Sequence, residues 1–146
     1  EPLLNPDHID YVVTEHQKHP EWDIVLPSLP IDKPETQHIC KVTHDANFRI
    51  LYLSRAVIPQ PFKHRPDFYL KHLSIISFTS ESLRHYSTLK PSNLEKVEGI
   101  ELLRAIENGM VVGTVLLEGD SFSVDIKQDF DKAIERMAID EMRKQY

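Results

Sequence analysis

Two polar residues close an apolar stretch in the middle of the chain, and their types could bind an anion. Residues 51–53 read as a buried strand, Ser54 and Arg55 follow, and Pro59 keeps the strand from continuing. Open α/β sheets tend to bind ligands at the ends of their strands. The planar guanidinium of Arg55 would suit a carboxylate or phosphate there, because it can pair with two oxygens at once. The alternative is an ordinary surface salt bridge.

Asp125 and His72 also stand at the boundaries of predicted elements. Asp125 follows a short strand and precedes a helix. A carboxylate at such a corner can bind Mg²⁺, which prefers carboxylates, water and phosphate oxygens, although it can also simply cap the helix. His72 begins an apolar strand, where its ring could donate a hydrogen bond to a sugar hydroxyl or carboxylate, or serve only the structure.

Two further groups of charged or metal-binding side chains have helical spacing. Glu98 and Glu101 lie one turn apart on a predicted helix, with Arg104 three residues further on, which is also typical of an ion pair on a solvated face. His16 and His19 could form half of a zinc site, but the sequence indicates no further ligands for it.

The composition is that of one ordinary domain of 146 residues with a formal net charge of −6. No run of lysines and arginines predicts a nucleic-acid or membrane partner. The single cysteine, Cys40, allows no internal disulfide, so we expect a reducing compartment, the cytoplasm. We see no apolar run of membrane-spanning length and expect no secretory leader. None of the four glycines forms a phosphate-binding loop, so any such loop would lie outside this sequence.

The hydrophobic periodicity predicts helices and strands in alternation, which indicates an α/β protein. The expected helices cover residues 6–19, 80–87, 93–107 and 129–144. The expected strands cover residues 23–26, 39–43, 49–53, 71–78, 110–117 and 122–124. The prolines predict loops at 27–34 and 59–66. Strands 39–43 and 49–53 should form an antiparallel hairpin, which makes the sheet mixed.

Five segments, in the same order and at similar separations, resemble the C-terminal part of the CMP-Kdo synthetases (3-deoxy-manno-octulosonate cytidylyltransferases). The segments are 1–6 (EPLLNP), 51–59 (LYLSRAVIP), 71–76 (KHLSII), 98–104 (EGIELLR) and 123–129 (SVDIKQD). Together they extend over nearly the whole chain. Each motif is moderately specific alone, and their common order makes the resemblance strong.

The resemblance implies a three-layer nucleotidyltransferase-type α/β fold with a mixed sheet, similar to the nucleotide-diphospho-sugar transferases. Residues 1–146 would form the C-terminal sugar-binding and dimerisation part of one domain, with the N-terminal nucleotide-binding half missing from the sequence. The whole enzyme would be a homodimer that activates Kdo or a related acidic sugar with CTP and Mg²⁺. Its products would be the CMP-sugar and pyrophosphate, for lipopolysaccharide or other surface polysaccharide. This stretch alone is expected to be inactive.

The resemblance also implies roles for particular residues. Asp125 and Arg55 would be catalytic, and Asp125 would bind Mg²⁺ together with an Asp immediately before Glu1, which the sequence does not contain. Ser54, Arg55, His72 and Glu101 would line the pocket for the sugar acid.

Departures from the family pattern concern the sugar side of the site. Ile76 stands where the family has Tyr, Leu102 where it has Gln, and Phe62 where it often has Arg. The first two changes remove hydrogen-bonding groups, and such groups discriminate strongly between substrates. The departures therefore favour a related acidic sugar over Kdo itself. The alternatives are a catalytically impaired paralogue or fragment that acts as a binding and dimerisation module, and an unrelated α/β binding domain.

Overall fold

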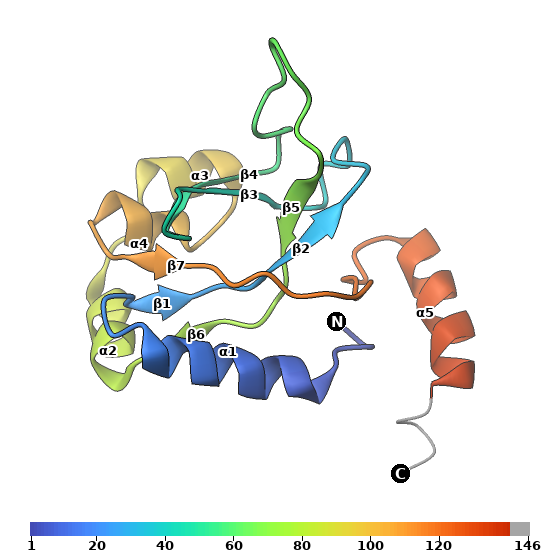
Figure 1. Ribbon diagram of the computed structural model, residues 1–146, viewed down its shortest axis with the longest axis horizontal. Coiled ribbons are helices and arrows are strands. Elements are labelled where there is room, and N and C mark those ends of the chain that lie inside the picture. The colour runs from blue at the N-terminus through green and yellow to red at the C-terminus, as the bar shows by residue number, and fades with distance from the viewer. Residues whose placement is uncertain (141–146) are drawn as a thin grey trace.

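Two β-sheets form the centre of the protein and helices lie around them (Figure 1). The computed structural model describes residues 1–140. The first sheet has the order β6-β1-β7 and consists of β1 (Ile24–Val25), β6 (Ser77–Phe78) and β7 (Val112–Gly113). The second sheet has the order β2-β5-β3-β4 and consists of β2 (Ser28–Ile31), β3 (Lys41–His44), β4 (Ile50–Ser54) and β5 (Tyr69–His72). Strand β1 runs antiparallel to β6 and parallel to β7, so the predicted mixed pairing is confirmed.

Helix α1 (Pro6–Lys18) begins and ends where local chemistry sets its boundaries. The Asn5 side chain accepts a hydrogen bond of 3.0 Å from the N–H of Asp7, which satisfies one donor of the first turn. The helix ends before Pro20, as predicted. On its inner face Val12 is fully buried, and this anchors the helix under the first sheet.

The proline-rich stretch 27–34 contains a strand, contrary to the prediction of a loop. Strand β2 pairs with β5 along four residues, including the pair Pro30 and Leu70. Proline is tolerated here because β2 is an edge strand of its sheet. Main-chain bonds on the other side of β2, to Val115 and Leu117, are made by Ser28, two residues before the proline.

The single strand predicted over residues 71–78 is two strands, β5 and β6, in different sheets. Between them the N–H of Ile75 donates to the Leu73 carbonyl at 2.7 Å, which closes a tight three-residue turn. The N–H of Leu73 donates to the Pro27 carbonyl at 2.9 Å. The first bond turns the chain between β5 and β6, and the second continues the pairing beside β2 one residue beyond His72.

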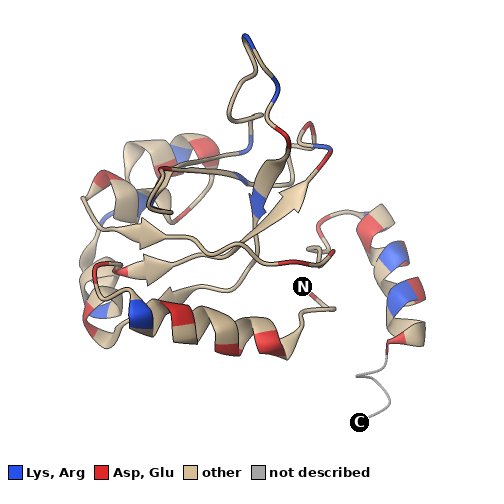
Figure 2. Cartoon of the chain, in the orientation of Figure 1, with Lys and Arg blue, Asp and Glu red and all other residues tan. Residues whose placement is uncertain are grey.

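The predicted hairpin is confirmed, with β3 antiparallel to β4. The Asp45 carboxylate closes its turn by accepting hydrogen bonds from the N–H groups of Asn47, at 2.8 Å, and Arg49, at 3.0 Å. The loop 59–66 has neither helix nor strand, as predicted, and it projects from the body and carries basic residues (Figure 2).

The long helix predicted over residues 93–107 is divided into α3 (Asn93–Glu98) and α4 (Leu103–Glu107). Gly99 adopts a left-handed conformation, with φ 64° and ψ 40°, and ends α3. A capping box of Ser92 and Glu95 fixes the start of α3. Leu94 of α3 and Leu103 of α4 pack against the same core, whereas Val97, which has the same spacing, is 81% exposed.

Helix α2 (Ser80–Thr88) is capped by Thr79, close to the predicted start. Helix α5 (Lys127–Ile139) matches part of the predicted span 129–144, of which residues 141–144 lie outside the described part of the chain. The strand predicted over 110–117 shortens to β7, and residues 122–124 form no strand.

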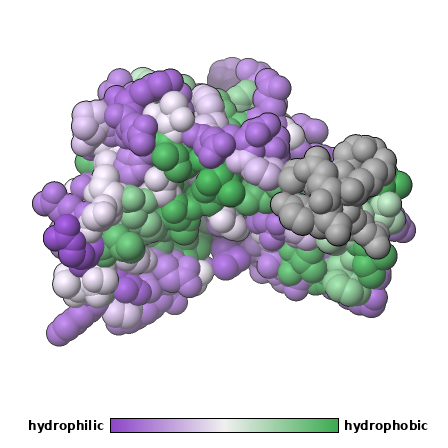
Figure 3. Space-filling model, turned by 90° about the horizontal axis from the view of Figure 1, so that it is seen from below, coloured by the Kyte–Doolittle hydropathy of each residue, from purple (hydrophilic) through white to green (hydrophobic). Residues whose placement is uncertain are grey.

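Helix α5 stands apart from the two sheets (Figure 1). The Lys132 ammonium lies 4.2 Å from the centroid of the Phe122 ring, and Arg136 pairs with Asp120. Apolar side chains show on the surface of this helix when the molecule is viewed from below (Figure 3), and Ile134 is 55% exposed. No helix among residues 1–140 combines the length and the apolar character needed to cross a membrane.

Two clusters of buried side chains form the core. One lies between the sheets and helices α3 and α4, and it includes Leu26, Val42 and Leu53. The other lies against α1 and contains Trp22. The indole ring of Trp22 packs directly on Gly113, where an added Cβ would lie 2.1 Å from the indole Cδ2.

Candidate active site

A cavity of about 640 Å³ opens where β4, β5, the α3–α4 connection and the segment before α5 meet. Arg55, His72, Glu101 and Asp125 all line it. These residues are far apart in the sequence, and the fold brings all four to one place. They are four of the five side chains to which the sequence analysis assigned a role.

The Arg55 guanidinium is bound mostly to main-chain carbonyls. Its Nε donates to Glu98 O at 3.0 Å, one terminal nitrogen donates to Gln37 O and His38 O at 3.3 Å each, and the other donates to Gly99 O at 3.4 Å. A guanidinium has five N–H donors, so these four contacts leave little of it for the bidentate carboxylate pairing predicted from the sequence. The side chain instead joins two parts of the cavity wall and places a positive charge there.

Ser54, the fifth predicted residue, lies behind the cavity. It is 1% exposed, and its hydroxyl donates to the Glu98 carboxylate at 2.7 Å. The same carboxylate accepts hydrogen bonds from the Arg55 N–H at 3.0 Å and the Tyr52 hydroxyl at 3.3 Å. Burial would raise the pKa of Glu98, but these three donors outweigh it and lower the pKa. Glu98 is therefore a supporting residue that the sequence analysis did not distinguish from an exposed glutamate.

His72 lines the cavity and has one ring nitrogen without a hydrogen-bond partner. Its Nδ1 is buried and has no hydrogen-bond partner within the described chain. Burial lowers the pKa of His72, which favours the neutral ring. A neutral imidazole can donate or accept one hydrogen bond at Nδ1, so this side chain is suited to a hydroxyl or carboxylate of a ligand.

Asp125 is exposed and does not cap helix α5, although the sequence allowed that alternative. The cap residue is Ile126, whose N–H donates to the Asp129 carboxylate at 3.2 Å. The N–H of Asp125 itself donates to the same carboxylate, also at 3.2 Å. Because the Asp129 carboxylate accepts from both of these N–H groups, the Asp125 carboxylate is not needed to cap the helix. It lies at the cavity wall instead.

Glu1 anchors the segment that leads to Asp125. Its carboxylate accepts hydrogen bonds from the hydroxyls of Ser121 at 2.7 Å and Ser123 at 2.9 Å. Lys71 donates to the carbonyl of Ser121. Burial would raise the pKa of Glu1, but the two hydroxyls and the nearby positive charges outweigh it and lower the pKa. These contacts border a smaller hollow of about 240 Å³ beside the main cavity, to which Asp125 also contributes.

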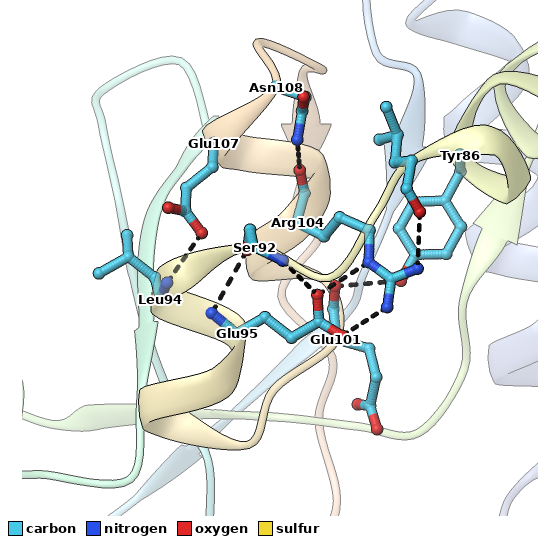
Figure 4. A network of polar contacts seen from close by, with 9 residues as sticks. Tyr86, Ser92, Leu94, Glu95, Glu101, Arg104, Glu107 and Asn108 are labelled. Carbon is cyan, nitrogen blue, oxygen red and sulfur yellow. Dashed lines mark hydrogen bonds and ion pairs between the residues drawn. The ribbon is translucent and has the colours of Figure 1, made fainter.

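Glu101 and Arg104 do not form the ion pair that their spacing allowed. The Arg104 guanidinium pairs with Glu95, with 2.8 Å from its Nε to the carboxylate, and both side chains are largely buried (Figure 4). The main-chain carbonyl of Glu101 accepts a hydrogen bond of 3.0 Å from the Tyr86 hydroxyl. The Glu101 carboxylate points away from this network in Figure 4, and it lines the cavity.

The donor groups of the cavity do not form a complete metal site by themselves. Within residues 1–140 no group of three or more His, Cys, Asp or Glu side chains converges as metal ligands would. His16 is one of the two histidines considered for a zinc site. Its Nδ1 lies 2.8 Å from the Ser77 hydroxyl and its Nε2 lies 3.1 Å from the Trp22 carbonyl. Asp125 remains a single exposed carboxylate, which fits a Mg²⁺ ion that takes its other ligands from water and a phosphate.

The structure defines a mixed α/β protein with a cavity at the ends of its strands, and comparison with known proteins identifies its family. Residues 1–118 match the model of the cytidylyltransferase family, so the chain belongs to that family. The resemblance to the CMP-Kdo synthetases predicted from the five segments is also confirmed.

Curated relatives in this family include two rickettsial proteins named 3-deoxy-manno-octulosonate cytidylyltransferase. The protein of Rickettsia akari is 35% identical over 135 residues, which cover 91% of this chain and 53% of the relative. That of Rickettsia prowazekii is 38% identical over 124 residues, which cover 84% and 49%. The chain thus spans about half the length of the curated relatives it matches.

A solved structure, described as CMP:2-keto-3-deoxy-manno-octonic acid synthetase complexed with CTP, has a similar fold. The TM-score is 0.87 at 26% sequence identity, and the match covers 94% of this chain and 58% of the other. This likeness confirms the predicted α/β fold with mixed strand pairing.

Proposed function

We propose that the protein carrying this chain is a cytidylyltransferase that activates Kdo or a related acidic sugar with CTP and Mg²⁺, releasing pyrophosphate. The observation that carries the proposal is the convergence of Arg55, His72, Glu101 and Asp125 on one cavity in a chain of this family. The cavity offers a cation for an acidic group, and an imidazole and carboxylates for hydroxyl groups.

The residues of the cavity would act by binding and orienting the two substrates. The positive charge of Arg55 would attract the sugar carboxylate, and the imidazole of His72 would bond to a sugar oxygen. Glu101 would accept a hydrogen bond from a sugar hydroxyl. The anomeric hydroxyl, held in this way, would attack the α-phosphate of CTP directly, with no covalent enzyme intermediate. Positioning of this kind supplies a large share of the rate in such reactions.

Asp125 would hold Mg²⁺, together with phosphate oxygens of CTP, water and a carboxylate preceding Glu1 in a longer chain. A bound Mg²⁺ neutralises the charge that develops on the phosphates during the transfer. The contacts of Glu1 with Ser121 and Ser123 support this proposal, because they hold the start of the chain beside the segment that carries Asp125.

We further propose that residues 1–146 supply the sugar-binding and dimerisation part of one domain in a cytoplasmic homodimer. The CMP-sugar would serve lipopolysaccharide or other surface polysaccharide synthesis. The stretch by itself would be inactive, because the sequence contains no phosphate-binding loop for CTP.

The apolar part of the cavity favours a second candidate, a sugar-acid binding module without turnover. Ile76 and Leu102 line the cavity, together with Leu26, Leu53 and Ile100. Apolar side chains cannot replace the hydrogen bonds by which a site selects hydroxyl groups. Binding of sugar acids without pyrophosphate release would support this candidate over the enzyme.

The test is a pyrophosphate-release assay on the full-length protein with CTP, Mg²⁺ and a panel of ulosonic acids that includes Kdo. We expect at least one sugar acid to support release, and Asp125→Asn to lower the rate by about a hundredfold or more. Asp131→Asn is the matched control, because Asp131 is an exposed carboxylate on α5 that pairs with Lys127 outside the cavity. Release with no sugar acid refutes the proposed function, and an unchanged rate in Asp125→Asn removes that residue from the mechanism.

A further inference from the structure

Lys41 is completely buried, although lysine is rarely buried without a partner. It lies on β3, with Ser54 opposite it on β4 and Lys71 opposite it on β5. Its ammonium donates to three main-chain carbonyls: Thr36 O at 2.9 Å, Ile39 O at 2.7 Å and Arg55 O. Its hydrogen-bond partners are thus neutral carbonyls.

The three carbonyls belong to two parts of the cavity wall. The segment 36–39 contributes Gln37 and His38 to the lining, and the end of β4 contributes Arg55. The same two parts are joined a second time on the cavity side, where the Arg55 guanidinium donates to the carbonyls of Gln37 and His38. Lys41 therefore ties together, from the core side, the two segments that Arg55 joins from the cavity side.

The chemistry of these contacts requires the ammonium form. Three simultaneous donors need three N–H bonds, which neutral lysine, glutamine and methionine do not have. Burial lowers the pKa of Lys41, which means that a charged ammonium at this position costs free energy. A side chain needed only for packing would not require that charge. A buried cation whose hydrogen bonds go only to carbonyls also adds positive potential beside Arg55, which favours an anion in the cavity.

We propose that Lys41 is a positioning residue, whose ammonium fixes the segment 36–39 against Arg55 and so shapes the wall that receives the acidic end of the sugar. Lys41 does not line the cavity and acts through the residues that do. The part of this inference that concerns the sugar rests on the proposed function. The part that concerns the wall rests only on the contacts of Lys41.

The test uses Lys41→Met, which keeps the length of the side chain and removes the ammonium. The control is Thr114→Val, which breaks another buried hydrogen bond, between Ser28 and Thr114 at 2.7 Å. Two properties of the full-length protein are measured: amide hydrogen exchange along the chain, and KM for the sugar acid and for CTP. In Lys41→Met we expect exchange at residues 36–39 to rise about tenfold or more. We expect KM for the sugar acid to rise about tenfold while KM for CTP changes less than about twofold.

The outcomes separate this inference from the proposed function. The positioning role is overturned if hydrogen exchange at residues 36–39 rises no more in Lys41→Met than in Thr114→Val. An unchanged KM for the sugar acid overturns the link between that wall and the sugar. A wild-type protein that turns over no sugar acid refutes the proposed function, and the exchange result still decides the role of Lys41. If Lys41→Met does not fold, Lys41→Gln is judged by the same criteria, because its amide retains two donors.

Discussion

Removing the Glu98 carboxylate should loosen the support behind the cavity by an amount that can be worked out from its contacts. In Glu98→Ala the hydroxyl of Ser54, which is 1% exposed, loses its acceptor at 2.7 Å. A buried polar group left without a partner costs about 1–3 kcal/mol. The N–H of Arg55 is exposed and can bond to water instead, and the bond from Tyr52 is long at 3.3 Å, so these two add little.

The expected loss is therefore about 2 kcal/mol in the free energy of unfolding, the middle of the range for one buried group. For a domain of this size such a loss lowers Tm by about 4–8 °C. Urea unfolding and thermal melting of the purified protein measure the two quantities. The matched control is Glu101→Ala, which removes a carboxylate one turn away that lines the cavity and should cost less than about 0.5 kcal/mol.

A double-mutant cycle tests the reasoning itself. Once Glu98 is gone, the Ser54 hydroxyl has no acceptor for its hydrogen and keeps only the bond from the Ala56 N–H at 3.0 Å. Ser54→Ala should therefore cost less in the Glu98→Ala protein than in the wild type. We expect a coupling energy of about 1–2 kcal/mol between the two changes. Fully additive losses would refute the claim that this hydrogen bond holds the end of β4 against α3.

Three further changes test other parts of the structure. Gly113→Ala should destabilise the protein by about 3 kcal/mol in urea unfolding, because the new Cβ would lie 2.1 Å from an atom of the Trp22 ring; a loss below about 1 kcal/mol would contradict this packing. The stability advantage of the wild type over Glu98→Ala should be fully present above pH 4.5 and shrink as the pH falls through the lowered pKa of Glu98, because the protonated group loses the interactions that lower this pKa. Urea unfolding over a pH series measures the change, and an advantage that stays equally large in acid would contradict the assignment. Changing Ile76→Tyr together with Leu102→Gln should raise pyrophosphate release with Kdo by about tenfold, and no gain would show that these positions do not set the choice of sugar.

The ends of the helices could be predicted from the sequence because their causes are local. Asn5 caps α1 and Thr79 caps α2 through side chains that lie within three residues of the groups they bond. The hairpin was predictable for the same reason, since Asp45 closes its turn. Local interactions of this kind can be predicted from a single sequence.

The elements that were predicted wrongly depend on distant parts of the chain. Strand β2 exists because β5 pairs with it, and nothing near Pro30 indicates that partner. The split of 71–78 into two strands follows from the sheets that each half joins. The glycine at position 99 did carry a local signal, but the regular spacing of apolar residues on both sides of it favoured one long helix.

The resemblance to a known family predicted the candidate site better than the spacing of its residues in the sequence did. The residue types of Arg55, His72 and Asp125 indicate what each side chain could bind. They do not indicate that the three side chains line one cavity. The roles of Glu98 and Lys41 have no signal in the sequence, since one looks like an exposed helical glutamate and the other like an alternating strand residue. Only the fold places the first under Ser54 and the second under the cavity wall.

The break at Gly99 has a consequence for attempts to engineer this protein. In an unbroken helix the carbonyls of residues 98 and 99 would accept from the amides four positions later. Here both accept from Arg55 instead. A substitution chosen to raise helix propensity at this position would favour the unbroken form, compete with Arg55 for its acceptors and free the guanidinium to move. Because any other residue would also be strained at the positive φ of Gly99, the backbone conformation and the placement of the Arg55 guanidinium both favour glycine here, and a consensus-style stabilisation should leave it in place.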